Sequence, residues 1–193
     1  MEYHNPVLLN ECIEGLNIKP TGIYVDVTFG GGGHSTEILK RLVTGKLFAF
    51  DRDSDVEANM PDDKNFKLLR TNYKNIKRLL RAEGIRKVDG ILADLGVSSH
   101  QFDVAERGFS FRFDAELDMR MNTNSELTAI EVLNEYSEVE LANLFYNYGE
   151  IRKSRKLAER IIILRQEKKI KTTSDLIEVL DKMAPEKRKN QFF

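Results

Sequence analysis

The chain has 193 residues, of which 41% are hydrophobic and 32% are charged, and its formal net charge is -1. This composition can bury a core for one domain or one and a half. The chain has no apolar run of membrane-spanning length and no N-terminal signal pattern, and the single Cys12 excludes an internal disulfide, so we expect a cytosolic protein. Three His, one Cys and no C-x-x-C motif provide no recognisable metal site.

The first distinctive stretch is an apolar segment that runs into four consecutive glycines. We expect an opening helix over residues 4–16 and a buried strand over residues 23–27, which leads to the glycines at 30–33. Ser35 can cap a following helix over residues 35–42. Glycines lack Cβ atoms, so their backbone N–H groups can approach a ligand closely at a helix end. This order of elements is typical of a nucleotide-binding site.

The glycine run alone has two interpretations, a nucleotide loop or a flexible turn. A dinucleotide fingerprint would place its third glycine at position 35, where this chain has Ser35. A second strand is expected over residues 46–50, and Asp51 follows it, eighteen residues after Gly33. An Asp at a strand end is often only a solvated cap. Because a ribose-binding acid lies about 20 residues beyond the glycine loop, Asp51 is expected to bind the hydroxyl groups of a ribose.

Two further strands continue the alternation of strand and helix. A strand is expected over residues 66–69, a helix over 73–82 and a fourth strand over 88–95. Alternating elements predict a parallel, doubly wound α/β sheet with right-handed crossovers. The first strand then lies between strands two and four, and the ligand binds at this switch point. Nothing in the pattern pairs with the far side of residues 88–95, which leaves an apolar edge.

The rest of the chain is expected to be helical. Residues 96–126 form a long irregular segment, and loops of that length tend to be functional. Residues 137–140 form a capping box, Ser-x-x-Glu, and Gly149 is expected to end the helix that follows it. The expected helices cover residues 138–147, 151–168 and 173 to about 183, the last one capped by Thr172 and Asp175. The architecture is therefore half a doubly wound sheet followed by a small helical unit.

Charge is divided unevenly along the chain. Residues 1–150 hold 17 Lys and Arg against 25 Asp and Glu, whereas residues 151–193 hold 13 against 6. A face of this kind is usually only solvated, but a local excess of positive charge also attracts a phosphate backbone, and both interpretations stay open. The basic positions that recur along the expected helix are Arg152, Lys153, Arg155, Lys156, Arg160, Arg165, Lys168, Lys169 and Lys171.

The end of the fourth strand carries the motif that points to a family. The switch-point topology brings residues 89–99, DGILADLGVSS, beside the glycine loop. Together with VDVTFGGGGHS (25–35), FDRD (50–53), ERGFSF (106–111) and LDMRM (117–121), this segment resembles the bacterial ribosomal RNA small subunit methyltransferase H family, the 16S rRNA cytosine-N4 methyltransferases. The resemblance covers essentially the whole chain.

The resemblance implies a Rossmann-like, S-adenosylmethionine-dependent fold with a helical domain inserted after the fourth strand. Residues 1–104 would be the first part of the cofactor-binding domain, and residues 105–193 would be the inserted helical domain. The implied substrate is a cytidine in the decoding region of 16S rRNA, in the small ribosomal subunit. Family members continue with a second set of strands, so we expect this chain to be truncated relative to the family.

The resemblance also implies site residues, and no metal. Three of these residues also have a purely structural alternative: His34 could cap its helix, Tyr73 could be a core residue, and Gln101 could fix only its own loop. The family's loop around the methionine part of the cofactor matches Gly32, Gly33 and His34, its ribose acid matches Asp51, its adenine-side aromatic residue matches Tyr73, its strand-four acid matches Asp94, and its polar contact after the DLGVSS turn matches Gln101.

Three other side chains keep two interpretations each. Phe109 and Phe111 are expected to anchor a folded lid, although their rings could instead stack on a flipped-out base. Asp26 faces either the ammonium group of the cofactor or a structural partner beside its strand.

The implied reaction is a direct displacement, in which the exocyclic N4 of cytidine attacks the sulfonium methyl group in line. The lone pair of N4 is delocalised into the ring, so the site must accept hydrogen bonds from the amine and hold it at near-attack distance. Asp94 is the expected acceptor, and the alternative is that Asp94 contacts only the cofactor. Two alternatives remain: a nicotinamide-dependent oxidoreductase, which Ser35 disfavours, and a non-catalytic RNA-binding fragment that uses the basic helix.

Overall fold

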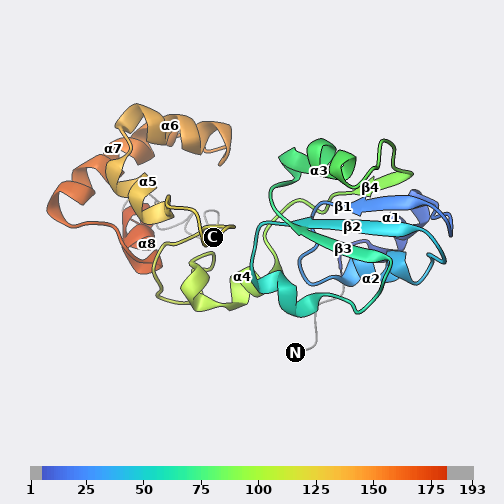
Figure 1. Cartoon of the computed structure of the whole chain (residues 1–193). Helices are drawn as coiled ribbons and strands as arrows, with labels where there is room; N and C mark the ends of the chain where they lie inside the picture. The colour runs from blue at the N-terminus through green and yellow to red at the C-terminus, as the bar shows by residue number, and fades with distance from the viewer. Residues whose placement is uncertain (1–5, 182–193) are drawn as a thin grey trace. The chain divides into compact units, whose positions relative to one another are not determined.

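The computed structural model describes residues 6–181, and the chain divides into two compact units. The first unit comprises the residues up to Ser98 together with Met121–Thr123. The second comprises Ser99–Arg120 and the residues from Asn124 onward. Each unit has a hydrophobic core of its own. Figure 1 shows the helices and strands of both units.

A four-stranded parallel sheet forms the centre of the first unit, as predicted. The strands are β1 (Ile23–Asp26), β2 (Lys46–Asp51), β3 (Phe66–Arg70) and β4 (Gly90–Leu92). Their order is β3-β2-β1-β4, so β1 lies between β2 and β4. Strands that are covered on both faces are apolar on both faces, and Tyr24, Val25, Leu47 and Phe48 are accordingly buried.

Helices cover both faces of this sheet, as the alternating pattern predicts. The helical elements are α1 (Leu9–Leu16), α2 (Gly33–Leu39) and α3 (Ile76–Ala82), with the short 3₁₀ helices η1 (Asp55–Asn59) and η2 (Tyr73–Asn75). Figure 1 shows α3 on one side of the strands and α2 on the other. Tyr24 and Leu47 pack in the core beneath α1 and α2, whereas Val25 and Phe48 pack in the core beneath α3.

The fourth strand is shorter than the predicted range of 88–95. Only Gly90–Leu92 pairs, because the partner strand β1 ends at Asp26, which lies opposite Leu92. Within residues 6–181 no strand pairs with the other side of β4, and Ile91 is 54% exposed there. The predicted apolar edge is therefore present but short.

The helix after the glycines begins two residues earlier than predicted. Gly32 is the N-cap of α2, and its φ of 77° is a left-handed conformation that glycine adopts readily. Ser35 lies inside the helix, so the prediction that it caps the helix is wrong. Its position on the first turn faces β1, and its hydroxyl donates to Asp26 Oδ2 at 2.7 Å.

The opening helix is also shorter than predicted, since α1 begins at Leu9. Residues 6–8 form a turn, in which Leu8 has a left-handed φ of 51°. The first residues of the predicted range, 4 and 5, lie outside the described residues. The turn brings Pro6 so close to the glycine loop that a Cβ at Gly33 would overlap the Pro6 ring.

The second unit is helical, as predicted. Its elements are α4 (Ser99–Asp103), η3 (Ala105–Arg107), α5 (Ala129–Glu135), α6 (Glu138–Asn147), α7 (Ser154–Glu167) and α8 (Thr173–Asp181). Helix α6 has the predicted bounds, and both hydrogen bonds of its predicted capping box are formed. The left-handed residue after α6 is Glu150, with a φ of 53°, rather than Gly149. The predicted end of the last helix near residue 183 lies outside the described residues.

Helix α5 is not among the predicted helices, although its start has the spacing of a capping box. The Thr128 hydroxyl accepts the backbone N–H of Glu131, and the Glu131 carboxylate accepts the backbone N–H and the hydroxyl of Thr128. The sequence Thr128-Ala129-Ile130-Glu131 is therefore the signal that would have predicted it. The core that α5 shares with the other helices contains Leu117, Leu133, Leu141, Leu157, Ala158, Ile161, Ile170 and Val179.

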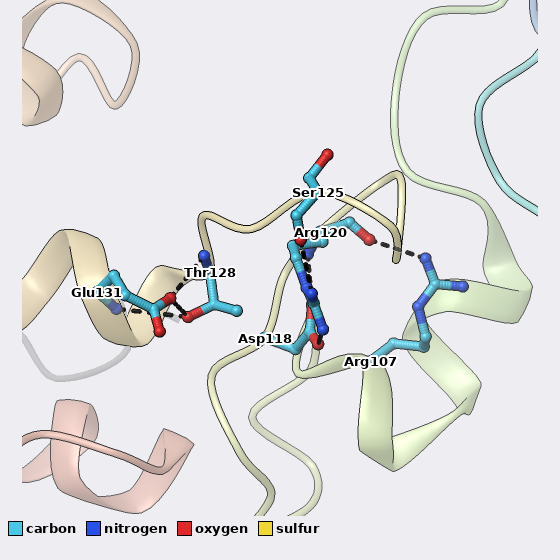
Figure 2. Close-up of polar contacts among 6 residues, drawn as sticks. All are labelled: Arg107, Asp118, Arg120, Ser125, Thr128 and Glu131. Carbon is cyan, nitrogen blue, oxygen red and sulfur yellow. Dashed lines mark hydrogen bonds and ion pairs between the residues drawn. The ribbon is translucent and has the colours of Figure 1, made fainter. Parts of the chain in front are cut away.

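A hydrogen-bond network organises the irregular segment before α5 (Figure 2). The Arg107 guanidinium donates to the carbonyl oxygen of Arg120 at 2.9 Å. The Arg120 guanidinium pairs with Asp118 at 2.6 Å and donates to the carbonyl oxygen of Ser125 at 2.7 Å. A guanidinium has five N–H donors, so one side chain can bind several stretches of backbone. The segment is irregular, as predicted, but its backbone is held in place by side chains.

Candidate functional site

Most of the predicted site residues follow the carboxyl ends of the four strands in the first unit. Parallel strands end at one edge of the sheet, and the order reverses at β1, so this edge is the switch point where doubly wound sheets bind ligands. Gln101 is the exception, because it belongs to α4 in the second unit. The residues at the sheet edge are Gly32, Gly33, His34, Asp51, Tyr73 and Asp94.

Asp51, the last residue of β2, holds the glycine loop in place. Its Oδ2 accepts the backbone N–H of Gly30 at 2.9 Å. Its Oδ1 accepts the backbone N–H groups of Arg52 and Asp53 at 2.7 Å and 3.0 Å. A carboxylate offers about four acceptor positions, so these three bonds leave Asp51 room for one further donor. The half-buried carboxylate can therefore anchor the loop and bind a hydroxyl group at the same time.

The first turn of α2 presents backbone donors beside the glycine loop that Asp51 anchors. The N–H groups of Gly33, His34 and Ser35 have no acceptor within residues 6–181, whereas the N–H of Gly32 donates to Phe29 O at 2.8 Å. Amides of this kind can bind a carboxylate or phosphate oxygen. The glycine loop therefore supplies donors where Asp51 supplies an acceptor.

The His34 ring points into the protein and contacts the N-terminal turn. The residue is 6% exposed, and its Nε2 lies 3.2 Å from the carbonyl oxygen of Val7. A carbonyl oxygen can only accept, so this contact requires the tautomer that is protonated at Nε2. The alternative that His34 caps the helix is wrong, because Gly32 is the N-cap. A ligand contact of His34 would use its main-chain amide or its other ring nitrogen.

A chain of hydrogen bonds, buried at Asp26 and exposed at Asp94, links β1, α2 and the turn after β4. Asp26 is fully buried, and its Oδ1 accepts the N–H and the hydroxyl of Thr28 at 3.0 Å and 3.3 Å, while Oδ2 binds Ser35. Thr28 Oγ1 in turn accepts the backbone N–H of Asp94 at 2.8 Å. Burial raises the pKa of the Asp26 carboxyl, and the hydrogen bonds from Ser35 and Thr28 partly offset this effect. Both oxygens are engaged, which favours the structural interpretation of Asp26.

Thr28 is a residue that sequence reasoning missed. It fixes the main chain of Asp94, the predicted catalytic acid, to the end of β1. The local signal was the Asp-x-Thr spacing of residues 26–28, which permits the side chain of Asp26 to accept from the backbone two residues on. The bond to Asp94 joins residues 66 positions apart and has no local signal.

Asp94 and Tyr73 both present side chains to solvent. The Asp94 carboxylate is exposed and makes no hydrogen bond or ion pair with the described residues, although its main chain is fixed. Tyr73 begins η2 and is 46% exposed, which contradicts the alternative that it is a core residue. The sheet edge therefore offers an unpaired acceptor and an accessible aromatic ring.

Three residues with predicted roles, Gln101, Phe109 and Phe111, belong to the second unit. Gln101 is buried, with 5% exposure, and its role as a cofactor contact stays a prediction. Phe109 is half-buried, and the Arg107 guanidinium lies 5.9 Å from the centre of its ring. Phe111 is 58% exposed. The anchoring role therefore fits Phe109 better than Phe111, and base stacking stays a prediction.

The basic block of the second unit is partly structural. Arg165 donates to the carbonyl oxygens of Leu133 and Tyr136 at the end of α5, at 3.0 Å and 2.7 Å. Lys168 pairs with Asp175 at 2.6 Å. Two of the nine basic positions that were read as one face therefore hold helices together.

Neither a membrane span nor a metal cluster is found in the part of the chain that the structure describes. Its helices are too short or too polar to cross a membrane. Residues 6–181 contain no group of three or more His, Cys, Asp or Glu side chains that could hold a metal ion.

Comparison with known proteins agrees with this geometry. The sequence profile of the MraW methylase family matches residues 1–192. The chain is 60% identical over 192 residues to the ribosomal RNA small subunit methyltransferase H of Flavobacterium johnsoniae, covering 99% of this chain and 64% of that protein. It is 57% identical over 181 residues to the protein of the same name from Christiangramia forsetii, covering 93% of this chain and 60% of that one. The chain thus spans somewhat less than two thirds of these relatives, and it belongs to the MraW methylase family.

Proposed function

We propose that this chain binds S-adenosylmethionine at the carboxyl edge of its sheet and that the whole protein methylates the exocyclic N4 of a cytidine in the decoding region of 16S rRNA, in the cytoplasm. The names of the relatives support a small-subunit rRNA methyltransferase. The observation that carries the proposal is the donor and acceptor set at the switch point: the Asp51 carboxylate with one acceptor position left, the amides of the first turn of α2, and the unpaired carboxylate of Asp94.

This set matches the chemical groups of S-adenosylmethionine. A ribose hydroxyl would donate to Asp51, and the carboxylate of the methionine part would accept from the amides of Gly33 and His34, beside Gly32. The exposed ring of Tyr73 would pack near the adenine, and Gln101 would add a polar contact. S-adenosylmethionine, when bound, supplies the methyl group on its positively charged sulfur.

Asp94 would act on the target amine. Its carboxylate would accept a hydrogen bond from N4–H, which orients the nitrogen, and it would take the proton that the amine loses. The bond from its backbone N–H to Thr28 already fixes its main chain, so less conformational freedom is lost when the amine binds. The same residue would also border the bound cofactor. The partner would be the 16S rRNA of the small ribosomal subunit.

Isothermal titration calorimetry tests the cofactor assignment. We expect saturable binding of S-adenosylmethionine and no binding of NAD. Asp51→Ala should weaken the binding by about tenfold or more, because a hydrogen bond to a charged group contributes about 1.5–3 kcal/mol. Asp89→Ala is the matched control, since Asp89 also accepts a backbone N–H, that of Ile23 at 2.9 Å, but before β4 at the opposite edge of the sheet.

Asp51 also anchors Gly30, so a weaker variant could reflect a displaced loop. A 2′,3′-dideoxy analogue of S-adenosylhomocysteine separates the two effects. If Asp51 binds the ribose, the analogue should bind the unmodified chain more weakly than S-adenosylhomocysteine does. The two ligands should then bind Asp51→Ala with nearly equal affinity, because the carboxylate that contacts the hydroxyl groups is absent. Binding of NAD, or equal losses with and without the carboxylate, would contradict the assignment.

Methyl transfer is tested separately, because the chain spans only part of its relatives. The chain is incubated with S-adenosylmethionine and unmethylated 16S rRNA, and the digested nucleosides are analysed by mass spectrometry. N4-methylcytidine is the expected product, and Asp94→Asn should abolish it while cofactor binding persists. RNA binding without any cofactor binding would instead favour the non-catalytic RNA-binding fragment.

A further inference from the structure

Helix α3 and the loop after it carry a dense group of exposed positive charges, here termed the α3 basic stripe. Residues 74–87 hold six Lys and Arg against one Glu, whereas the rest of residues 1–98 holds eight Lys and Arg against thirteen Asp and Glu. The stripe is thus a basic surface on an otherwise acidic unit. Its members are Lys74, Lys77, Arg78, Arg81, Arg86 and Lys87, all of them exposed.

The helix places most of these charges on one face. Lys74, Lys77, Arg78 and Arg81 have the spacing i, i+3, i+4 and i+7, which is one side of a helix. The opposite side packs into the core under the sheet through Ile76, Leu79 and Leu80. The basic side therefore faces outward.

A sharp turn at the end of α3 extends the stripe into the loop. Gly84 has a φ of 77°, its N–H donates to Arg81 O at 3.0 Å, and the N–H of Ile85 donates to Leu80 O at 2.8 Å. These two bonds define a Schellman motif, which reverses the chain after a helix. As a result Arg81, Gly84 and Arg86 line one open hollow of about 530 Å³.

The charges of the stripe are not used within the first unit. None of the six side chains has an ion pair or hydrogen bond with residues 6–181. The one acid of the segment, Glu83, pairs with Lys67 of β3 at 2.7 Å. By contrast, the cations elsewhere in this unit that do pair within it are Lys19, Lys40, Arg41, Lys67 and Arg70.

Folding stability does not explain the stripe. Lys77 and Arg78 lie in the first turn of α3, where the helix dipole disfavours positive charge. Lys74 and Arg78, and also Lys77 and Arg81, are like-charge pairs at the spacing i, i+4, which destabilise a helix. A surface that lowers the stability of its own helix and has no internal partner suits an anionic partner.

We propose that the α3 basic stripe binds the phosphate backbone of the RNA substrate. The inference rests on the proposed function, since it takes RNA as the partner, and it adds where the first unit contacts that RNA. Arginine guanidinium groups match phosphates in a two-bond geometry, and charges repeated along a helix match the repeated phosphates of one strand. The stripe begins at Lys74, directly after Tyr73, so it leads toward the edge of the sheet that carries the candidate site. Contacts of this kind would position the RNA without reading its sequence.

Fluorescence anisotropy with a labelled single-stranded RNA tests the proposal, without cofactor and without methyl transfer. The slope of log K against log [KCl] is measured for the 193-residue chain and for the triple variant Lys77→Gln, Arg78→Gln, Arg81→Gln. The slope is negative, and each lost phosphate contact reduces its magnitude by about 0.7. The triple variant should therefore have a slope that is smaller in magnitude by about 2, and its affinity at low salt should be at least about tenfold lower. The matched control is Lys40→Gln, Lys46→Gln, Lys64→Gln, which removes the same charge from exposed positions elsewhere in the unit.

Two further measurements keep the outcome clear. The double variant Arg86→Gln, Lys87→Gln lies outside the helix, and it should also reduce the magnitude of the slope, by about 1.4, even if the triple variant unfolds. An unchanged slope in these variants, or an equal loss in the control, would overturn the proposal. The proposal would also be overturned if the variants of the stripe lost binding to vesicles that contain phosphatidylserine but kept their binding to RNA. The anisotropy measurement uses no cofactor, so its outcome does not depend on whether the chain binds S-adenosylmethionine in calorimetry.

Discussion

Two irregular stretches of this chain are held in place by opposite kinds of side chain. In the glycine loop at residues 27–33, the carboxylates of Asp26 and Asp51 accept hydrogen bonds from backbone N–H groups. In the segment at residues 104–128, the guanidinium groups of Arg107 and Arg120 donate to backbone carbonyl oxygens. The first arrangement leaves other N–H groups of its loop free to bind a ligand, whereas the second serves the loop itself.

The difference follows from the reach and the chemistry of the two groups. An aspartate side chain is short and its carboxylate only accepts, whereas an arginine side chain is long and its guanidinium only donates. A carboxylate can be protonated in acid, whereas a guanidinium stays charged. The two stretches should therefore respond differently to added volume, to loss of a side chain and to pH.

The largest expected effect comes from adding a methyl group to one glycine in each stretch. Gly108 has a φ of 69°, and a Cβ there would overlap the carbonyl oxygen of Glu116, which is backbone. Gly30 has a φ of 50°, but a Cβ there would meet only Thr28 O at 3.9 Å. Gly108→Ala should lower the free energy of unfolding by about 3 kcal/mol and Gly30→Ala by about 1 kcal/mol.

Urea unfolding followed by circular dichroism measures both variants. The left-handed backbone strain is common to the two positions. The additional loss of unfolding free energy in Gly108→Ala, relative to Gly30→Ala, therefore reports how tightly the second stretch is packed. Equal losses would mean that the backbone around Glu116 moves aside easily, and the segment would then be less firmly held than its arginines suggest.

A smaller effect is expected from removing an arginine that holds a second connection in the same manner. Arg165 of α7 donates to Leu133 O and Tyr136 O. Arg165→Met keeps much of the side chain's length but leaves two carbonyl oxygens without this donor, so it should cost about 2 kcal/mol. Arg165→Lys should recover part of the loss, because one nitrogen, Nη1, makes both bonds and an ammonium nitrogen can also donate to two acceptors, although the lysine side chain is shorter. Lys156→Met, at an exposed position of the same helix, is the control and should change stability by less than about 0.5 kcal/mol in urea unfolding. Similar losses at the two positions would contradict this role of Arg165.

The features that the sequence predicts correctly are those with a local signal. Alternation of apolar runs predicts the sheet order around β1, and the spacing of Ser137 and Glu140 predicts the start of α6. Asp51 was found because it directly follows the second apolar run, and the structure places it beside Gly30. The same capping spacing at Thr128 and Glu131 would have predicted α5.

The features that the sequence does not predict depend on partners far apart in the chain. The bond between Thr28 and Asp94, and the reach of Arg107 to Arg120, have no pattern in the residues themselves. Ser35 was assigned to the wrong role for the same reason, since its real partner is on another element. The length of β4 was overestimated because an apolar run does not reveal where its partner strand ends.

The smallest expected effect concerns pH, and two carboxylates, Asp26 before the glycine loop and Glu131 at the start of α5, should show opposite signs. Burial raises the pKa of Asp26 above its ordinary value of 3.8, so the folded state holds that proton more tightly than the unfolded state. Its contribution to stability is present below pH 3.8 and is lost as the pH rises through the raised pKa. Hydrogen bonds from the side chain and the backbone of Thr128 lower the pKa of Glu131 below 4.5, so its contribution is present above that pH and is lost as the pH falls.

Urea unfolding of Asp26→Asn and Glu131→Gln across the acidic to neutral range tests these signs. Asn preserves an acceptor for Thr28 and a donor for Ser35, so the first variant should fold. The advantage of the unmodified chain over Asp26→Asn should shrink as the pH rises, whereas its advantage over Glu131→Gln should shrink as the pH falls. Parallel slopes would mean that Asp26 is as well solvated as Glu131, and the buried carboxylate could not then be what keeps β1, α2 and the turn after β4 together.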